Sequence, residues 1–191
     1  MNRFSAAGAM ICLALAILVL PLRWVIAAVI AAGVHELCHY WAVRLFGGTV
    51  LNLQIGLHGA KMQVKDLSWG RELLCALAGP AGSLALLLAS RWFPRVAIWG
   101  GMQGIYNLLP IYPMDGGRAV RCLIAMFFSA PTAENVSDLI QRISLLLLLG
   151  CGIYGCFSLK LGLFPLMVAI FACLRGYQGK IPCKLLKNSL Q

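Results

Sequence analysis

The sequence has few charged residues and only short polar stretches. Charged residues occupy 12% of its 191 positions and only six of them are acidic, whereas 61% of the positions are apolar. A water-soluble domain of this length does not enclose so much apolar surface in one core, so this scarcity of charge excludes an ordinary soluble protein. The composition instead predicts a protein that lies in a lipid bilayer.

Cysteine pairs are also absent. The eight cysteines stand singly, most of them within apolar runs, and no C-x-x-C spacing occurs. This pattern indicates neither a disulfide framework nor a zinc ribbon, so we interpret the cysteines as reduced, small apolar side chains. Sixteen basic residues give a net charge of +10. On so apolar a chain this excess reflects membrane topology, and we expect no nucleic-acid partner.

Apolar runs recur that are long enough to cross a bilayer, which takes about 20 residues. No small-residue cleavage site follows the first run, so we expect it to be retained. If each run crosses once, twelve of the sixteen basic residues lie on one side, which predicts that both termini are cytoplasmic. We therefore predict an all-α polytopic membrane protein with a single domain over residues 1–191. Its six spans are residues 4–20, 24–46, 72–90, 96–128, 143–159 and 161–176. The fourth run is interrupted, so it forms either one broken span or two shorter segments.

The longest polar stretch, residues 47–66, predicts a small β-hairpin at the cytoplasmic membrane face. Leu51, Leu53 and Ile55 alternate with Asn52, Gln54 and Gly56, and this period of two is typical of a strand. An open strand edge could bind an extended peptide. A connecting hairpin without a substrate role is the alternative that the pattern leaves open.

A second polar stretch, residues 129–142, mixes charged side chains with aliphatic ones. This mixture is typical of an amphipathic helix that lies in the membrane interface. We therefore predict a short interfacial helix there, separate from the span that follows.

The segment HELCH is the most informative about chemistry. His35 and His39 are four residues apart in a run without helix breakers, so both imidazoles project from one face of the second span. This spacing is typical of zinc hydrolases, in which two histidines bind Zn²⁺ and a glutamate, here Glu36, takes a proton from water. Ionisable groups in a membrane span cost at least about 2.5 to 3.5 kcal/mol each and are usually functional. We therefore predict a metal site.

Asp115 is the strongest candidate for the third protein ligand that a catalytic zinc needs. Pro110 and Pro113 precede it and two glycines follow, so the fourth run must break where this carboxylate stands. Broken backbone at membrane depth is tolerated where it is enclosed by protein or lines a wet cavity. Asn107, in the same run, either positions a substrate or forms hydrogen bonds that cap the helix at its interruption.

Other polar residues are weaker candidates. His58 lies in the polar hairpin, where we expect it to be solvated, and Cys38 is more consistent with packing than with ligation. Glu72 suits a helix N-terminus. The segment AGPAGSLALL, residues 78–87, indicates a bent span with close helix packing, and we assign no role to Ser83.

Three motifs are spread over residues 34–118, namely HELCH, AGP and NLLPIYPMDGG. On these motifs the chain resembles the site-2 protease family of intramembrane zinc metalloproteases, the M50 type. NLLPIYPMDGG and GGTV are most similar to its sporulation branch, whose members cleave a sigma-factor precursor. The resemblance implies a bacterial inner-membrane protein with a three-helix catalytic core over about residues 24–128 and one zinc reached from the cytoplasm. It further implies that His35, His39 and Asp115 bind the zinc, that Glu36 is the catalytic residue and that Asn107 positions substrate.

The resemblance predicts hydrolysis of a peptide bond in or near the membrane segment of a regulatory protein. The expected partners are a membrane-associated or single-span substrate, the lipid bilayer, and a membrane regulator or a second copy. We expect neither the CBS-type domain of the sporulation enzymes nor a PDZ insertion. A membrane zinc transporter or metal sensor that uses the same ligands is the alternative, and a catalytically silent scaffold is a second one.

Overall fold

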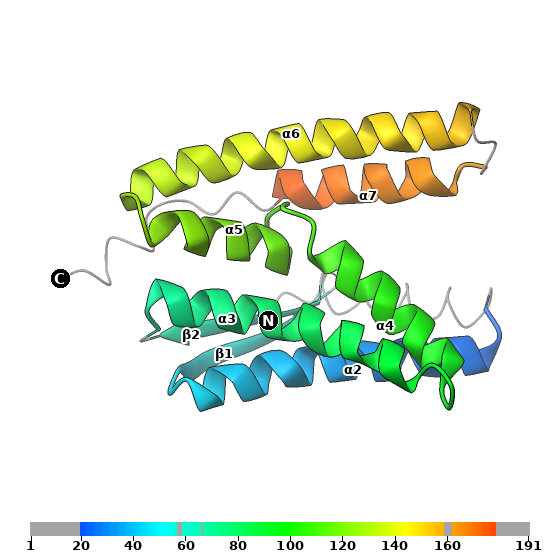
Figure 1. Ribbon diagram of the computed structural model, residues 1–191, viewed down its shortest axis with the longest axis horizontal. Coiled ribbons are helices and arrows are strands. Elements are labelled where there is room, and N and C mark those ends of the chain that lie inside the picture. The colour runs from blue at the N-terminus through cyan, green and yellow to red at the C-terminus, as the bar shows by residue number, and fades with distance from the viewer. Residues whose placement is uncertain (1–19, 57–58, 66, 159–161, 179–191) are drawn as a thin grey trace.

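The computed structural model describes residues 20–56, 59–65, 67–158 and 162–178 (Figure 1). Nearly all of the first predicted span, the turn with His58 and the basic C-terminal tail lie outside these residues. Helices dominate the described chain, and one pair of strands follows the first described helix. The elements are α2 (Leu22–Leu45), β1 (Thr49–Gly56), β2 (Gly59–Lys65), α3 (Trp69–Ala85), the 3-10 turn η1 (Leu86–Ala89), α4 (Pro94–Asn107), α5 (Asp115–Ala125), α6 (Ala130–Phe157) and α7 (Phe164–Gln178).

Helix α3 is central to the arrangement, because it packs against α2, α4 and α5. Helices α6 and α7 lie side by side as a separate layer, and α5 lies between this layer and the group of α2, α3 and α4 (Figure 1). A methyl group added at Gly100 of α4 would lie 2.7 Å from the Ser83 carbonyl oxygen, and one added at Gly104 would lie 3.2 Å from that of Pro80. The four-residue spacing of these two glycines therefore lets α4 pack directly on the α3 backbone.

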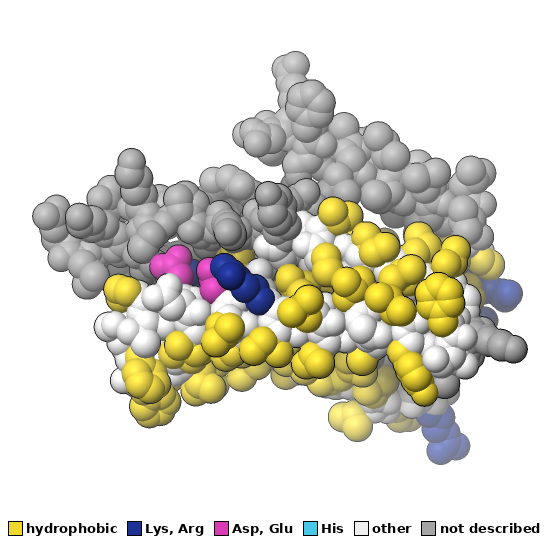
Figure 2. Space-filling model, turned by 90° about the horizontal axis from the view of Figure 1, so that it is seen from above, with side chains coloured by type: hydrophobic (Ala, Val, Ile, Leu, Met, Phe, Trp, Pro, Cys, Tyr) yellow, Lys and Arg dark blue, Asp and Glu magenta, His cyan; other side chains and the backbone are white. Residues whose placement is uncertain are grey.

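Three described helices are long and apolar enough to cross a membrane, namely α2, α3 continued by η1 to Ala89, and α6. The fourth predicted span is two shorter helices, α4 and α5, which residues 108–114 separate. Figure 2 shows one face of the molecule, on which apolar side chains are spread widely, acidic side chains lie beside basic ones at one place, and further basic side chains lie at the opposite end. Many of the exposed apolar side chains belong to α6, including Leu139, Ile143, Leu146, Leu147 and Phe157. Six crossings remain a prediction.

The prediction of a separate interfacial helix over residues 129–142 is wrong. These residues form the first half of α6, which runs without a break for 28 residues from Ala130. Pro131 lies in the first turn, where its missing N–H removes no intrahelical hydrogen bond, and no proline follows it in the helix. The helix therefore continues from the polar segment into the apolar one.

Helix α2 ends in a glycine motif that turns the chain into the strands. Gly47 has φ +74°, its N–H donates to the Arg44 carbonyl, and the Gly48 N–H donates to the Val43 carbonyl at 2.9 Å. This pair of hydrogen bonds is the Schellman arrangement, in which a left-handed residue favours glycine. Strands β1 and β2 then pair antiparallel within the predicted hairpin range, from Thr49 opposite Lys65 to Gly56 opposite Gly59.

The connection between α4 and α5 is tight, and two of its residues are buried. Ile111 and Met114 are 0% and 3% exposed and pack with Ala172 of α7. A methyl group added at Gly116 would lie 2.5 Å from the Leu109 carbonyl oxygen, and one added at Gly117 would lie 2.5 Å from the Tyr112 nitrogen. The two glycines therefore let the connection fold back over the first turn of α5, which begins at Asp115.

Candidate metal centre

The two histidines lie on the buried stripe of α2. The buried residues of this helix include Ala27, Ala31, His35, His39 and Ala42. Because positions four apart share one face of a helix, the imidazoles follow the alanines onto the side that packs against α3 and α4. His35 is 2% exposed and His39 is 9% exposed.

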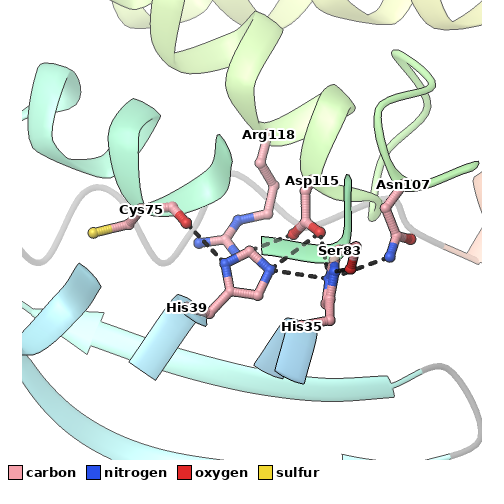
Figure 3. Close-up of polar contacts among 7 residues, drawn as sticks. All are labelled: His35, His39, Cys75, Ser83, Asn107, Asp115 and Arg118. Carbon is pink, nitrogen blue, oxygen red and sulfur yellow. Dashed lines mark hydrogen bonds and ion pairs between the residues drawn. The ribbon is translucent and has the colours of Figure 1, made fainter. Parts of the chain in front are cut away.

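The structure brings His35, His39 and Asp115 together as a group of three possible metal ligands (Figure 3). The Asp115 Oδ2 atom lies 3.1 Å from His35 Nε2 and 3.2 Å from His39 Nε2. The two Nε2 atoms lie 3.2 Å from each other. Three donor atoms from helices α2 and α5 thus form a nearly equilateral triangle.

This triangle fits a tetrahedral zinc ion. Zinc lies about 2.0–2.1 Å from imidazole nitrogen and carboxylate oxygen, which places neighbouring ligand atoms about 3.3–3.4 Å apart in a tetrahedron. The observed edges of 3.1–3.2 Å are close to that value. Two imidazoles and one carboxylate also leave a fourth position open, as catalytic zinc sites require. The donor set therefore fits the ion that the sequence predicts.

Hydrogen bonds from α3 orient both imidazole rings. His39 Nδ1 lies 2.8 Å from the Cys75 carbonyl oxygen, and His35 Nδ1 lies 2.8 Å from Ser83 Oγ. A carbonyl oxygen only accepts, so the hydrogen of neutral His39 is on Nδ1 and the lone pair is on Nε2. His39 Nε2 faces Asp115 (Figure 3), so several acceptor atoms converge, and a bound cation satisfies such an arrangement.

Asp115 is held at the first residue of α5. The position suits a carboxylate, because the N-terminus of a helix carries partial positive charge. The other oxygen of the carboxylate, Oδ1, lies 4.0 Å from the Arg118 guanidinium, which in turn lies 3.8 Å from Glu72 of α3. Arg118 therefore faces the oxygen that points away from the histidines, so Oδ2 is left facing them (Figure 3).

Asn107, the last residue of α4, borders the three ligands. Its Nδ2 atom lies 3.2 Å from His35 Nε2, so this amide lies beside the ligand group, and its role in positioning substrate stays a prediction. Glu36 follows His35 in α2 and is half-buried. Its catalytic role stays a prediction.

Cys38 does not belong to the three-ligand group. Its sulfur faces α3 at Gly82, where an added methyl group would collide with it. The packing role predicted for this cysteine agrees with that contact.

Sequence reasoning missed the part that α3 plays in the centre. Cys75, Gly79 and Ser83 follow one another at four-residue intervals and lie on one helix face, opposite the two histidines, which are also four residues apart. Gly79 leaves room for the His39 ring, which a methyl group there would overlap. The matching four-residue spacing in the two apolar segments is the signal that could have revealed this face.

Three comparisons find known proteins that this chain is similar to. Residues 76–151 match the sequence family described as Peptidase family M50. A zinc metalloprotease of Methanocaldococcus jannaschii is 31% identical over 133 residues, which cover 59% of this chain and 38% of that protein. The solved structure of a site-2 protease from the same organism has a similar fold, with a TM-score of 0.66 and 20% identity over 93% of this chain and 88% of the other.

Residues 76–151 are thus similar to Peptidase family M50, and the fold is similar to that of a site-2 protease. These similarities agree with the predicted resemblance, and three apolar helices of spanning length indicate an integral membrane protein. Zinc is the metal that both the donor set and the relative indicate. The chain spans less than half the length of the curated zinc metalloprotease that it matches.

Proposed function

We propose that this protein is an intramembrane zinc endopeptidase that hydrolyses a peptide bond in or near the membrane segment of another protein. The observation that carries the proposal is the triangle of His35 Nε2, His39 Nε2 and Asp115 Oδ2, with edges of 3.1–3.2 Å. It lies among helices of which two, α2 and α3, are long and apolar enough to span a bilayer. A zinc site with an open position at that depth is suited to hydrolysis within the membrane.

In this mechanism His35, His39 and Asp115 hold the zinc, which when bound supplies Lewis-acid chemistry. Glu36 takes a proton from the attacking water, whose oxygen bonds to the scissile carbonyl carbon. As the C–N bond breaks, Glu36 delivers that proton to the leaving nitrogen. Asn107 donates from its amide to the substrate backbone beside His35 and so fixes the scissile bond relative to Glu36.

The substrate must be extended at the cleaved bond, because the carbonyls of a regular helix are already hydrogen-bonded. In the described chain β1 and β2 pair only with each other, so each strand offers one outer edge to an extended segment. We propose that the substrate pairs with this hairpin. A membrane-bound regulatory protein such as a sigma-factor precursor is the first substrate to test, because NLLPIYPMDGG and GGTV resemble the sporulation branch.

The proposal places both termini and the opening of the active site on the cytoplasmic side. The support is the distribution of basic residues over the sequence. A membrane regulator or a second copy of the chain would bind on the same side or through the apolar helix faces.

The test compares wild-type protein with Glu36→Gln in cells. New protein N-termini in the membrane fraction are identified by mass spectrometry, and the zinc content of each purified variant is measured. We expect Glu36→Gln to retain zinc and to lower the yield of specific cleavage products by about 100- to 10,000-fold, because it removes the general base. The matched control is Glu134→Gln on α6, a half-buried carboxylate outside the cluster, which should leave the cleavage pattern unchanged.

Identical cleavage products from wild type and Glu36→Gln would show that the glutamate is not the base. A wild-type protein that binds no zinc would refute the metal centre itself. Zinc flux into liposomes that persists in Glu36→Gln, without any cleavage product from wild type, would favour the transporter alternative.

A further inference from the structure

Ser83 is a buried polar residue that the proposed mechanism does not use. It lies in α3 and is 0% exposed, and its hydroxyl oxygen lies 2.8 Å from His35 Nδ1. The residue also touches α4 closely, since a methyl group added at Gly100 would lie 2.7 Å from the Ser83 carbonyl oxygen. The backbone of Ser83 thus faces α4, while its hydroxyl lies against the ring of His35 (Figure 3).

The two histidines are oriented by different kinds of group. For His39, a backbone carbonyl fixes the hydrogen on Nδ1, and that carbonyl is present whatever side chain stands at position 75. For His35 the equivalent partner is a side-chain hydroxyl, so here the orientation depends on the residue type. Removing this hydroxyl would leave His35 Nδ1 without its partner in a buried environment.

We propose that Ser83 is a positioning residue for the metal centre: its hydroxyl accepts a hydrogen bond from His35 Nδ1–H and so keeps the Nε2 lone pair aimed at the metal. This inference rests on the proposed metal site and adds to it the residue that sets the tautomer and ring orientation of His35. Groups that bind the second nitrogen of a ligating histidine typically alter metal affinity by about 10- to 100-fold when removed.

The test measures zinc affinity in purified protein by competition with a chromophoric chelator. Ser83→Ala should weaken zinc binding by about 10- to 100-fold. Ser83→Thr and Ser83→Val form a matched pair of nearly equal shape, of which only the first retains a hydroxyl. We expect Ser83→Thr to bind zinc more tightly than Ser83→Val by a similar factor, although both side chains have one heavy atom more than serine.

Two further readouts separate positioning from a merely structural role. The thermal unfolding of the metal-free protein should differ little between Ser83→Thr and Ser83→Val, whereas the visible spectrum of the cobalt-substituted protein should differ, since the ligand field depends on how His35 is held. If the Thr and Val variants bind zinc equally, or if Ser83→Ala binds as wild type does, the inference is wrong. If wild type itself binds no zinc, the proposed metal site fails instead.

Discussion

Gly79 offers the sharpest test of the metal centre, because its missing side chain makes room for a ligand. A methyl carbon added there would lie 2.6 Å from both Cδ2 and Cε1 of His39 and closer still to Nε2. Ordinary contacts between carbon atoms are about 3.5–4.0 Å, so in Gly79→Ala the ring must withdraw by about 1 Å. Metal–ligand distances tolerate only about 0.2 Å. The displaced imidazole therefore no longer ligates.

We expect Gly79→Ala to lose one of three protein ligands and to bind zinc at least about 100-fold more weakly, a larger effect than that of losing a hydrogen bond to a ligand. Chelator competition on the purified protein measures this affinity. Gly33→Ala on α2 is the matched control, since an added methyl group there meets nothing within 4 Å and alanine favours the helix. Wild-type zinc affinity in Gly79→Ala would refute the packing of α3 against His39.

Two other substitutions test the set of metal ligands and the packing of the connection that precedes Asp115. Asp115→Asn should weaken zinc binding by roughly 100-fold or more, because it removes the anionic ligand, whereas Asp138→Asn, an exposed carboxylate on α6, should not; equal affinities of the two variants would contradict the ligand set. Gln141 accepts from the Tyr112 N–H at 2.9 Å and donates to the Gly176 carbonyl at 3.3 Å. Gln141→Leu should lower the free energy of unfolding by about 1–3 kcal/mol, and Gln141→Glu by less because it keeps the acceptor; a thermal melt of Gln141→Leu identical to wild type would rule this out.

The three candidate metal ligands could be picked out from the sequence because each carries a local signal. His35 and His39 show the helical spacing that places two side chains on one face, and Asp115 stands between prolines and glycines that must interrupt a helix. Gly47 likewise marks the end of α2. These signals involve neighbouring residues only, so they hold whatever the tertiary arrangement.

The orientation of the ligands could not be predicted, because it depends on contacts between α2 and α3. The Cys75 carbonyl is a backbone group and leaves no mark in the sequence, and Ser83 resembles any small residue of a close-packed span. The uninterrupted helix α6 was missed for a different reason. Its polar first half and apolar second half have opposite compositions, yet helix propensity is compatible with both, so the change in composition marks a change of environment rather than a helix end.

The four-residue ladder of Cys75, Gly79 and Ser83 constrains how the sequence of α3 can change. Each residue of an α-helix turns the next by about 100°, so a single insertion between positions 75 and 83 would rotate Ser83 away from His35 or the Cys75 carbonyl away from His39. Substitutions on the exposed side of α3, such as at the half-exposed Leu74, leave the rotation of the helix unchanged. Over this segment the protein should accept many exchanges of apolar residues but hardly any change of length.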